Sequence, residues 1–287
     1  MIMVTGGTGM VGGEILHLLS QAGVAAKALT RNVKKAPDLE GITWVDGDMA
    51  RPETLPAAFA GSDTLFLVSS IDLDTVALQH NALEAARRAK VDHIVKLSAF
   101  GASDHSRAPI LLWHHQVEEE MKRSGIDWTI LRPHHFMQNL LTQLDYIVND
   151  GVVYSPSGDG KIPYVDAKDI AAVAAVTLTR PGHRGKTYVV TGGEALSYRQ
   201  ATAIIGETIG KKLRFVDETP DQTRARRERE GYPPAIIEGI LAIGAYQRAG
   251  GKTVTITSVI PDLIGRPAHT FPEFAREHAA VFRGEKA

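Results

Sequence analysis

The glycine cluster near the start of the chain constrains the fold more than any other feature. Met1–Thr5 is an apolar run, and the residues after it read GGTGMVG, which satisfies both GxGxxG and GxxGxxG. Val11–Leu19 then carries apolar residues at helical spacing. Glycine is required where a strand turns tightly into a helix, where backbone approaches a pyrophosphate, and where the helix packs closely on the strand. The sequence therefore predicts a dinucleotide-binding βαβ unit, with a purely structural glycine turn as the alternative.

Short apolar runs and amphipathic stretches continue to alternate after this unit. The expected strands are Met1–Thr5, Ala25–Thr30, Thr43–Val45, Thr64–Val68, His93–Leu97 and Trp128–Leu131. The expected helices start near Met10 and Pro52, run from an Asp72 cap to Arg88, and cover Ile110–Arg123. Strands that are apolar on both faces and alternate with helices predict a doubly wound parallel sheet of the α/β class.

The pattern changes near residue 150, where turn clusters appear at Asp150-Gly151 and over Ser155–Gly160. The elements expected beyond them are a strand near Tyr164, a helix over Ala167–Thr179, a strand at Tyr188–Val190, and helices over Tyr198–Ile209, Pro234–Arg248 and Pro272–Phe282. We expect residues 1–150 to form the dinucleotide-binding domain and residues 151–287 to form a smaller, mainly helical lobe. A strand near residues 186–191 is expected to return to the first sheet.

Composition excludes several classes of function. The chain has 287 residues, no cysteine, and a formal net charge of -1 from 32 basic and 33 acidic residues. The lack of cysteine excludes disulfides, thiol nucleophiles and thiolate metal sites, and it fits a reducing cytoplasm. The charge balance offers no basic face to nucleic acid or to an anionic membrane. The N-terminus does not read as a signal peptide, and the longest strongly apolar stretch, Ile170–Val176, is too short to span a bilayer.

The end of the second strand bears on the choice of nicotinamide cofactor. NAD-binding sites usually carry an acidic residue about 20 positions past the glycines, which accepts hydrogen bonds from a ribose 2′-hydroxyl. This chain has Arg31-Asn32 there, with Lys34 and Lys35 close behind. A guanidinium fork pairs well with phosphate, so Arg31 favours NADP(H) over NAD(H). The alternative is that Arg31 is simply a surface residue.

Asp48 and Met49 follow the third strand and have two interpretations. The carboxylate of Asp48 could accept a hydrogen bond from the amino group of an adenine that Met49 covers. Asp48 could instead be a turn residue that caps the helix at Pro52. Both interpretations stand on the sequence.

With these features in place, the chain resembles the NmrA-like branch of atypical short-chain dehydrogenases/reductases. Within that branch it is most similar to NADPH-dependent quinone reductases and triphenylmethane-dye reductases. The resemblance covers nearly the whole chain, through segments such as TGGTGMVG, ALTRN, HIVKLSAFGA, IDWTILRPHHFMQN, GKIPYVDAKDIAAVAA and GRPAHTFPEFAREHA. It implies a Rossmann domain, a smaller C-terminal lobe and a substrate cleft between them.

The resemblance also implies a role for individual residues, most of them at the carboxyl ends of the strands. Gly6, Thr8, Gly9, Met10 and Val11 would hold the pyrophosphate, and Arg31, Asn32 and Lys35 the 2′-phosphate of NADP(H). Asp48 and Met49 would flank the adenine, Ser69 and Ser70 would line the nicotinamide ribose, and Ser98 would lie beside the nicotinamide, with Pro133 and His134 after the sixth strand.

The catalytic motif of the classical members, Tyr-x-x-x-Lys on the helix after the fifth strand, is missing. That helix carries His114 and His115 and has no tyrosine. A literal match runs from Tyr164 to Lys168, but it follows the sixth strand, where Asp166 is expected to cap the next helix. Carbonyl reduction by a tyrosine acid is therefore disfavoured.

A quinone or a cationic dye carbon is electrophilic enough to accept hydride directly, so the protein need only orient it. His115, together with Ser98, is the candidate for catalysis, because a histidine titrates near neutral pH and could contact substrate or deliver a proton. The alternative for His115 is a structural histidine of the helix. Phe100 and Phe136, together with Trp113 and Met137, could form an apolar wall for a planar substrate, with His134 beside them, although such residues are often core.

Two histidine pairs, at 114–115 and 134–135, suggest a metal at first sight. Adjacent helix residues diverge by ~100°, so both members of the first pair cannot face one ion, and no metal site is expected.

These observations predict an NAD(P)H-dependent oxidoreductase that reduces a quinone or similar electrophilic aromatic compound, with NADPH preferred. The alternative is a non-catalytic NADP(H)-binding redox sensor that acts through a protein partner. The mixed charges of Arg224–Glu230 are interpreted as a solvated helix face, and as a partner-binding edge only under the sensor hypothesis. The expected partner is a small aromatic substrate, with no nucleic acid and no membrane, in a monomer or homodimer.

Overall fold

The computed structural model describes residues 1–285, which fall into two compact units. The first contains Met1–Ser106, Leu111–Pro133 and Ala167–Val189. The second contains Arg107–Ile110, His134–Asp166 and the chain from Val190 onward. Each unit has its own hydrophobic core.

The first unit is built on a seven-stranded sheet in the order β3-β2-β1-β4-β5-β6-β9. Neighbouring strands from β3 through β6 all pair in parallel. The strands are β1 (Ile2–Val4), β2 (Ala26–Thr30), β3 (Ile42–Asp46), β4 (Thr64–Leu67), β5 (His93–Leu97), β6 (Asp127–Pro133) and β9 (Lys186–Val190). The predicted doubly wound parallel sheet is confirmed.

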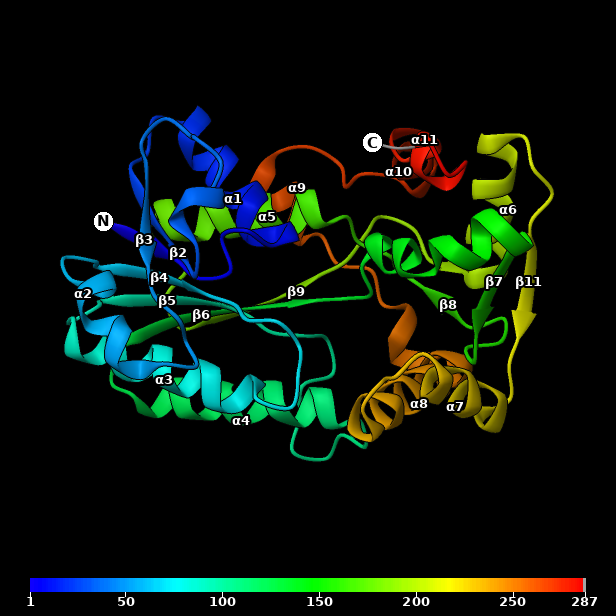
Figure 1. Ribbon diagram of the computed structural model, residues 1–287, viewed down its shortest axis with the longest axis horizontal. Coiled ribbons are helices and arrows are strands. Elements are labelled where there is room, and N and C mark those ends of the chain that lie inside the picture. The colour runs from blue at the N-terminus through cyan, green and yellow to red at the C-terminus, as the bar shows by residue number, and fades with distance from the viewer. Residues whose placement is uncertain (286–287) are drawn as a thin grey trace. The chain divides into compact units, whose positions relative to one another are not determined.

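Helices cover both faces of this sheet (Figure 1). On one face lie α1 (Met10–Gln21) and α5 (Ala167–Thr179), and on the other lie α3 (Thr75–Arg88) and α4 (Pro109–Arg123). The short elements η1 (Val33–Lys35), η2 (Pro52–Thr54) and α2 (Leu55–Phe59) fill connections. Leu65, Ile94 and Ile130 of the sheet are fully buried in one cluster with Leu83 of α3 and Val117 of α4. The alternate strand residues Phe66, Val95 and Leu131 are fully buried too, which explains why these strands read as apolar on both faces.

The second unit is mainly helical and carries two small sheets. β7 (Val152–Ser155) pairs in parallel with β11 (Arg214–Asp217), and β8 (Lys161–Ile162) pairs antiparallel with β10 (Leu196–Ser197). The remaining elements are η3 (Met137–Gln143), η4 (Tyr146–Asp150), α6 (Tyr198–Ile209), α7 (Pro220–Arg229), α8 (Pro234–Ala249), η5 (Gly251–Val254), α9 (Val259–Ile264), α10 (Phe271–Glu277) and α11 (Ala279–Phe282). No helix in residues 1–285 is long and apolar enough to cross a membrane.

Several element boundaries differ from the sequence expectations. The helix expected to begin at an Asp72 cap begins at Thr75, with Asp74 at the N-cap position. The strand expected near Tyr164 ends at Ile162. The helix expected over Pro272–Phe282 is two helices, interrupted at His278, whose ring nitrogen Nδ1 lies 2.9 Å from the Phe274 carbonyl oxygen.

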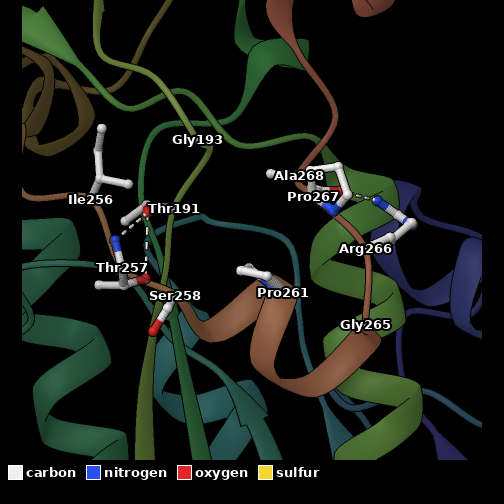
Figure 2. Close-up of a pocket in the computed structure, with 10 residues that line it drawn as sticks. All are labelled: Thr191, Gly193, Ile256, Thr257, Ser258, Pro261, Gly265, Arg266, Pro267 and Ala268. Atoms are coloured by element: carbon white, nitrogen blue, oxygen red, sulfur yellow. Dashed lines mark hydrogen bonds between the residues drawn. The ribbon is translucent and has the colours of Figure 1, made fainter.

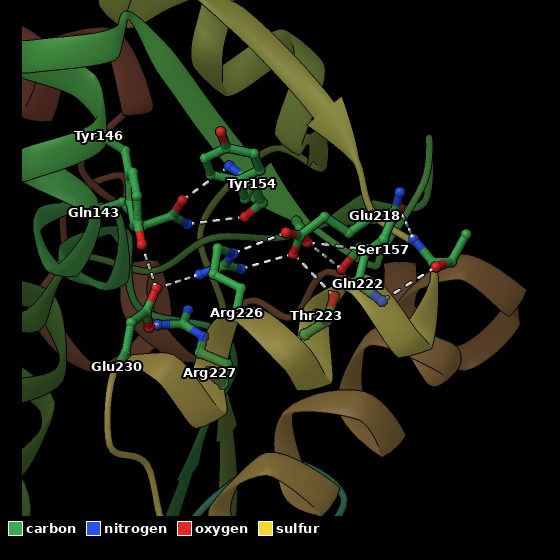
Figure 3. Close-up of polar contacts among 12 residues, drawn as sticks. Gln143, Tyr146, Tyr154, Ser157, Glu218, Gln222, Thr223, Arg226, Arg227 and Glu230 are labelled. Atoms are coloured by element: carbon green, nitrogen blue, oxygen red, sulfur yellow. Dashed lines mark hydrogen bonds and ion pairs between the residues drawn. The ribbon is translucent and has the colours of Figure 1, made fainter.

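The charged run on α7 is only partly the solvated face that its mixed signs predicted: Glu228 and Arg229 are exposed, whereas Arg226 and Arg227 are buried (Figure 3). Arg226 is 5 % exposed and forks onto Glu218, which follows β11 and is equally buried. Arg226 and Arg227 also each donate to Glu230. Arg224 alone among these arginines pairs at the surface, with Glu238. The run therefore anchors α7 within the second unit.

Candidate functional site

The strand order of the first unit reverses between β1 and β4, and this point is where doubly wound sheets bind nucleotides. Thr5 joins the two loops there. Its backbone N–H donates to the Phe66 carbonyl, its hydroxyl donates to the Val68 carbonyl at 2.8 Å, and the same hydroxyl accepts the Val68 N–H at 2.8 Å. The glycine loop after β1 is thus fixed to the loop after β4.

The glycine loop is shaped by close backbone contacts. Gly6 has φ +61°, and a Cβ there would lie 2.7 Å from the Val68 side chain. A Cβ on Gly12 would overlap the Gly6 carbonyl oxygen, because the first turn of α1 passes directly against the loop. Both positions require glycine, as a phosphate-binding turn does.

The start of α1 is left open to an anion. Gly9 is the N-cap residue, with no side-chain cap, and the first turn carries no acidic residue. The first N–H groups of a helix have no intrahelical partner, and they lie at the positive end of its dipole. Thr8 and Met10 are exposed beside them, whereas the Val11 side chain is buried, so Val11 can contribute only its backbone N–H. This geometry fits a diphosphate.

The loop after β2 supplies cations next to the glycine loop, because β2 is the neighbour of β1 in the sheet. Arg31, Lys34 and Lys35 are exposed, and none of them has an ion-pair partner within residues 1–285. The Asn32 backbone N–H donates to the Thr30 hydroxyl, which fixes the turn that precedes η1. These cations remain available to a phosphate.

The loop after β3 uses Asp48 to build a turn. Its Oδ1 accepts the Ala50 N–H at 2.9 Å, and its Oδ2 lies 3.7 Å from Arg51 Nε. The carboxylate is still 22 % exposed. Met49 is buried in the core cluster and accepts a hydrogen bond from Asn81 through its carbonyl. Asp48 therefore keeps an accessible oxygen, while the Met49 side chain contacts the core.

Ser69 and Ser70 follow β4, on the other side of the reversal point. The Ser69 hydroxyl donates to the Ser70 carbonyl and accepts from Gln79 Nε2 of α3 at 2.9 Å. Because its proton is already used, Ser69 can offer only a lone pair to a ligand. Gln79 is 1 % exposed and orients this hydroxyl, a role that the sequence alone did not reveal.

Ser98, after β5, is buried and belongs to a polar network. Its hydroxyl donates to the Glu118 carboxylate of α4 in a short hydrogen bond. Arg132 of β6 forks onto the same carboxylate, with Nε to Oε1 at 3.0 Å and Nη2 on Oε2. The Ser98 proton points to Glu118 rather than to a ligand, so this hydroxyl can accept but not donate.

Lys96 and His114 extend this network and were not among the sequence candidates. Lys96 is 0 % exposed; its Nζ donates to the Leu97 carbonyl at 3.1 Å and lies 3.2 Å from His114 Nδ1. Burial lowers the pKa of Lys96 to about 7, and burial beside Lys96 lowers the pKa of His114 well below its usual value. The signal that could have found them is a lysine inside the apolar strand HIVKL, since lysine is almost never fully buried without a function or a partner.

The other candidates of the first unit lie nearby. His115 is half-buried on α4 next to His114 and makes no hydrogen bond within the described residues. Phe100 and Pro133 are joined by a 2.9 Å backbone hydrogen bond just past the ends of β5 and β6. Apart from Met49, whose side chain joins the core, the predicted residues of this unit therefore lie in the carboxyl-end loops, in the first turn of α1 or, for His115, on α4.

The remaining candidates belong to the second unit. His134 is buried; its Nδ1 accepts the His135 N–H, and burial lowers its pKa to about 4. Phe136 is half-buried and forms a β-bridge with Val165. Tyr164, from the Tyr-x-x-x-Lys match, lies in the core cluster at 2 % exposure, and burial raises its pKa well above the usual value. Such a tyrosine is poorly placed to serve as an acid.

The second unit also holds a largely apolar pocket of about 660 Å³ (Figure 2). Its lining residues are Thr191, Gly193, Ile256, Thr257, Ser258, Pro261, Gly265, Arg266, Pro267 and Ala268. Thr191 Oγ1 accepts the Thr257 N–H at 3.0 Å, which ties the segment before α9 to the chain after β9. No group of three or more His, Asp or Glu residues in the described part of the chain could hold a metal ion.

Comparisons with known proteins agree with this geometry. The family model described as "NmrA-like family" matches residues 1–242. The NAD(P)H azoreductase of Xenophilus azovorans is 37% identical over 98% of this chain and 99% of its own length.

Two solved structures of related reductases are similar to this chain over nearly its whole length. The NADPH-dependent quinone oxidoreductase QOR2 of Escherichia coli, complexed with NADPH, has a TM-score of 0.86 and 27% identity over 96% of this chain and 99% of that one. The Citrobacter triphenylmethane reductase complexed with NADP(H) has a TM-score of 0.84 and 27% identity over 97% of this chain and 100% of that one. On the strength of the family model and the azoreductase match, the chain belongs to the NmrA-like family.

Proposed function

We propose that this chain is an NADPH-dependent oxidoreductase that reduces a quinone, an azo compound or a similar electrophilic aromatic acceptor by direct hydride transfer. The observation that carries the proposal is the phosphate-binding loop: a Gly6–Gly12 contact that excludes any side chain, beside the uncapped start of α1 and the unpaired Arg31. The matches to an azoreductase, a quinone oxidoreductase and a dye reductase support the choice of acceptor.

The residues present fit NADP(H). The backbone N–H groups of Met10 and Val11 would bind the diphosphate, while the Gly9 N–H already donates to the Gly6 carbonyl at 2.9 Å and holds the turn. Arg31 would bind the 2′-phosphate. Ser69 would accept a hydrogen bond from the nicotinamide ribose. When bound, NADPH supplies the hydride. The chain contributes orientation, because the acid of the classical motif is missing and Tyr164 lies in the core.

The test is spectrophotometric. Purified protein is mixed with NADPH and, in turn, a naphthoquinone, an azo dye and a triphenylmethane dye, and the absorbance of the reduced nicotinamide is followed. We expect oxidation that depends on the acceptor and a higher kcat/KM with NADPH than with NADH. NADPH binding without acceptor-dependent oxidation would contradict the proposal and favour the redox-sensor alternative.

A further inference from the structure

The buried layer between the sheet and α4 contains Lys96, whose positive charge is not matched by a carboxylate of its own. Lys96 and Ser98 are two residues apart on the β5 side of this layer, so they share a face, and Glu118 of α4 meets Ser98. Arg132 already neutralises Glu118 through a fork. Lys96 is therefore left with a neutral partner, His114, and an isolated buried ammonium is costly unless something uses it.

The contact between Lys96 and His114 fixes the histidine tautomer. A protonated amine has only donors, so Nδ1 of His114 must be the acceptor of this 3.2 Å hydrogen bond. The ring proton then resides on Nε2. That nitrogen has no hydrogen-bond partner among residues 1–285, and His114 is 6 % exposed. Nδ1 of His114 therefore contacts the buried Lys96 ammonium, and Nε2 carries a proton that makes no hydrogen bond within that range.

This second end lies at the edge of the sheet where ligands bind. The helix α4 returns the chain between the parallel strands β5 and β6, so it runs opposite to them. Glu118 meets Ser98, which follows the last residue of β5, and His114 is one turn, about 6 Å, nearer the start of α4. His114 thus lies beyond the carboxyl end of β5, where a doubly wound sheet receives its ligand.

We propose that Lys96 and His114 form a proton relay for the reductase, in which His114 Nε2 protonates the reduced acceptor and Lys96 restores the proton through Nδ1. The inference rests on the proposed function. Each hydride accepted leaves the acceptor one proton short. The His114 Nε2–H bond breaks as a bond from the acceptor's oxygen or nitrogen to hydrogen forms, and a Lys96 Nζ–H bond breaks as the Nδ1–H bond forms. Water then protonates Nε2, and the Nδ1 proton returns to Lys96.

The electrostatics support the relay. Lys96 is faced by Glu118 and His114 of α4 and by Arg132 of β6, while α5, on the other face of the sheet, carries the buried Asp169. Burial outweighs the attraction to Glu118 and lowers the pKa of Lys96 to about 7. A donor with this pKa can both lose and regain a proton near neutral pH.

The experiment compares the wild type with His114→Gln and Lys96→Met. Glutamine keeps a donor near the Nε2 position but cannot pass a proton on, so a purely structural role would survive the change. We expect wild-type kcat with an azo dye to be constant below about pH 7 and to fall above it. Both variants should lose this pH dependence, and their kcat with the azo dye should fall by about 100-fold or more. The loss should be smaller with a quinone, because water readily protonates the anion that forms when a quinone is reduced. Imidazole should restore part of the activity of His114→Ala.

A second measurement does not depend on turnover. Nitrogen NMR of the histidines in the cofactor-free protein should show the Nε2–H tautomer at position 114, and Lys96→Met should release this preference. His93→Gln is the matched control. His93 is also buried on β5, but it lies at the opposite end of the strand, and its Nε2 is in a hydrogen bond with the Thr129 hydroxyl at 2.9 Å. It should keep the pH dependence of kcat.

The outcomes separate the two proposals. If the wild type does not oxidise NADPH with any acceptor, the reductase function and the relay both fail. If the wild type is active but His114→Gln keeps its pH dependence and more than about a third of its kcat, the relay alone is wrong. Loss of the pH dependence in His115→Gln instead would assign proton delivery to His115 and would also overturn the relay.

Discussion

Gly12 is the residue whose replacement tests the phosphate-binding loop most directly. A methyl group at this position would overlap the Gly6 carbonyl oxygen, so Gly12→Ala must push α1 away from the loop. We expect a loss of about 1–3 kcal/mol in the free energy of unfolding and a weaker affinity for NADPH. Differential scanning calorimetry and fluorescence titration with NADPH would measure the two effects.

The control for this change is the next residue of the same helix. A Cβ on Gly13 would lie 3.4 Å from the Gly7 carbonyl oxygen, close to an ordinary contact. Gly13→Ala should leave NADPH affinity within about twofold and should not lower the melting temperature, since alanine favours a helix by about 1 kcal/mol over glycine. Equal effects of the two substitutions would mean that the Gly6–Gly12 contact is not what shapes the loop.

Arg31 decides cofactor preference if its free guanidinium binds the 2′-phosphate. Arg31→Glu should remove a charge-assisted hydrogen bond worth about 1.5–3 kcal/mol, which corresponds to a 10- to 150-fold increase in the KM for NADPH. The KM for NADH should change far less, because NADH lacks that phosphate. Arg88→Glu, an exposed arginine at the end of α3, makes the same change in net charge and should affect neither cofactor. A parallel loss with NADPH and NADH would exclude this role for Arg31.

At the scale of single residues, the sequence could point to those parts of the candidate site that depend on local backbone. The glycines and Arg31 became candidates because a strand, a tight turn and a helix follow one another in the chain. Lys96, Glu118 and Arg132 were not found, because their hydrogen bonds join three elements and only the fold brings these elements together. The same limit applies to Gln79, whose partner Ser69 lies on another element.

At the scale of elements, α7 depends on a pair of ions that its own sequence does not reveal. Arg226 bonds to Glu218 and Glu230, and its guanidinium lies 5.0 Å from the centre of the Tyr154 ring (Figure 3). Arg226→Met would leave Glu218 buried without its cation, so we expect a loss of about 3–5 kcal/mol in the free energy of unfolding, measured by urea denaturation.

The matched control is on the same helix. Arg224 pairs with Glu238 where the two side chains are 39% and 49% exposed, so Arg224→Met should lower the free energy of unfolding far less than Arg226→Met does. If the two substitutions destabilise the protein equally, the buried fork does not anchor α7. Arg226 and Glu230 are both within α7, but Glu218 comes from outside the helix, and for that reason the sequence of α7 alone was interpreted as a solvated face.

Other elements show the same difference between features that are local in sequence, which could be predicted, and contacts with distant residues, which could not. The helices α5 and α6 have the bounds predicted from periodicity, because their apolar faces are local in sequence and, for α6, the Ser197 capping box directly precedes the helix. The strands β7 and β11 were missed, because each is short and its partner in the two-stranded sheet lies about 60 residues away, with Val152 beside Arg214. Short strands with distant partners leave no periodic signal.

At the scale of the whole molecule, buried bases set how stability depends on pH. Burial lowers the pKa of His93 and His134 to about 4 and that of His135 to about 3, from 6.5. Below pH 6.5 the unfolded chain therefore binds more protons than the folded one, and stability falls as the pH falls. Lys96 acts on the alkaline side: its pKa is about 7 when folded and 10.5 otherwise, so stability rises as the pH rises above 7.

The melting temperature should therefore fall steeply between pH 6.5 and 4 and should rise between pH 7 and about 9.5, before tyrosines ionise. Each of these histidines contributes on the order of 1–3 kcal/mol to the acid limb. Lys96→Met removes the only group in this set that produces the alkaline rise, so it should flatten that limb. His93→Gln should instead reduce the acid slope. An alkaline rise that persists in Lys96→Met would show that Lys96 is charged in the folded protein, and a charged lysine could not exchange its proton near neutral pH.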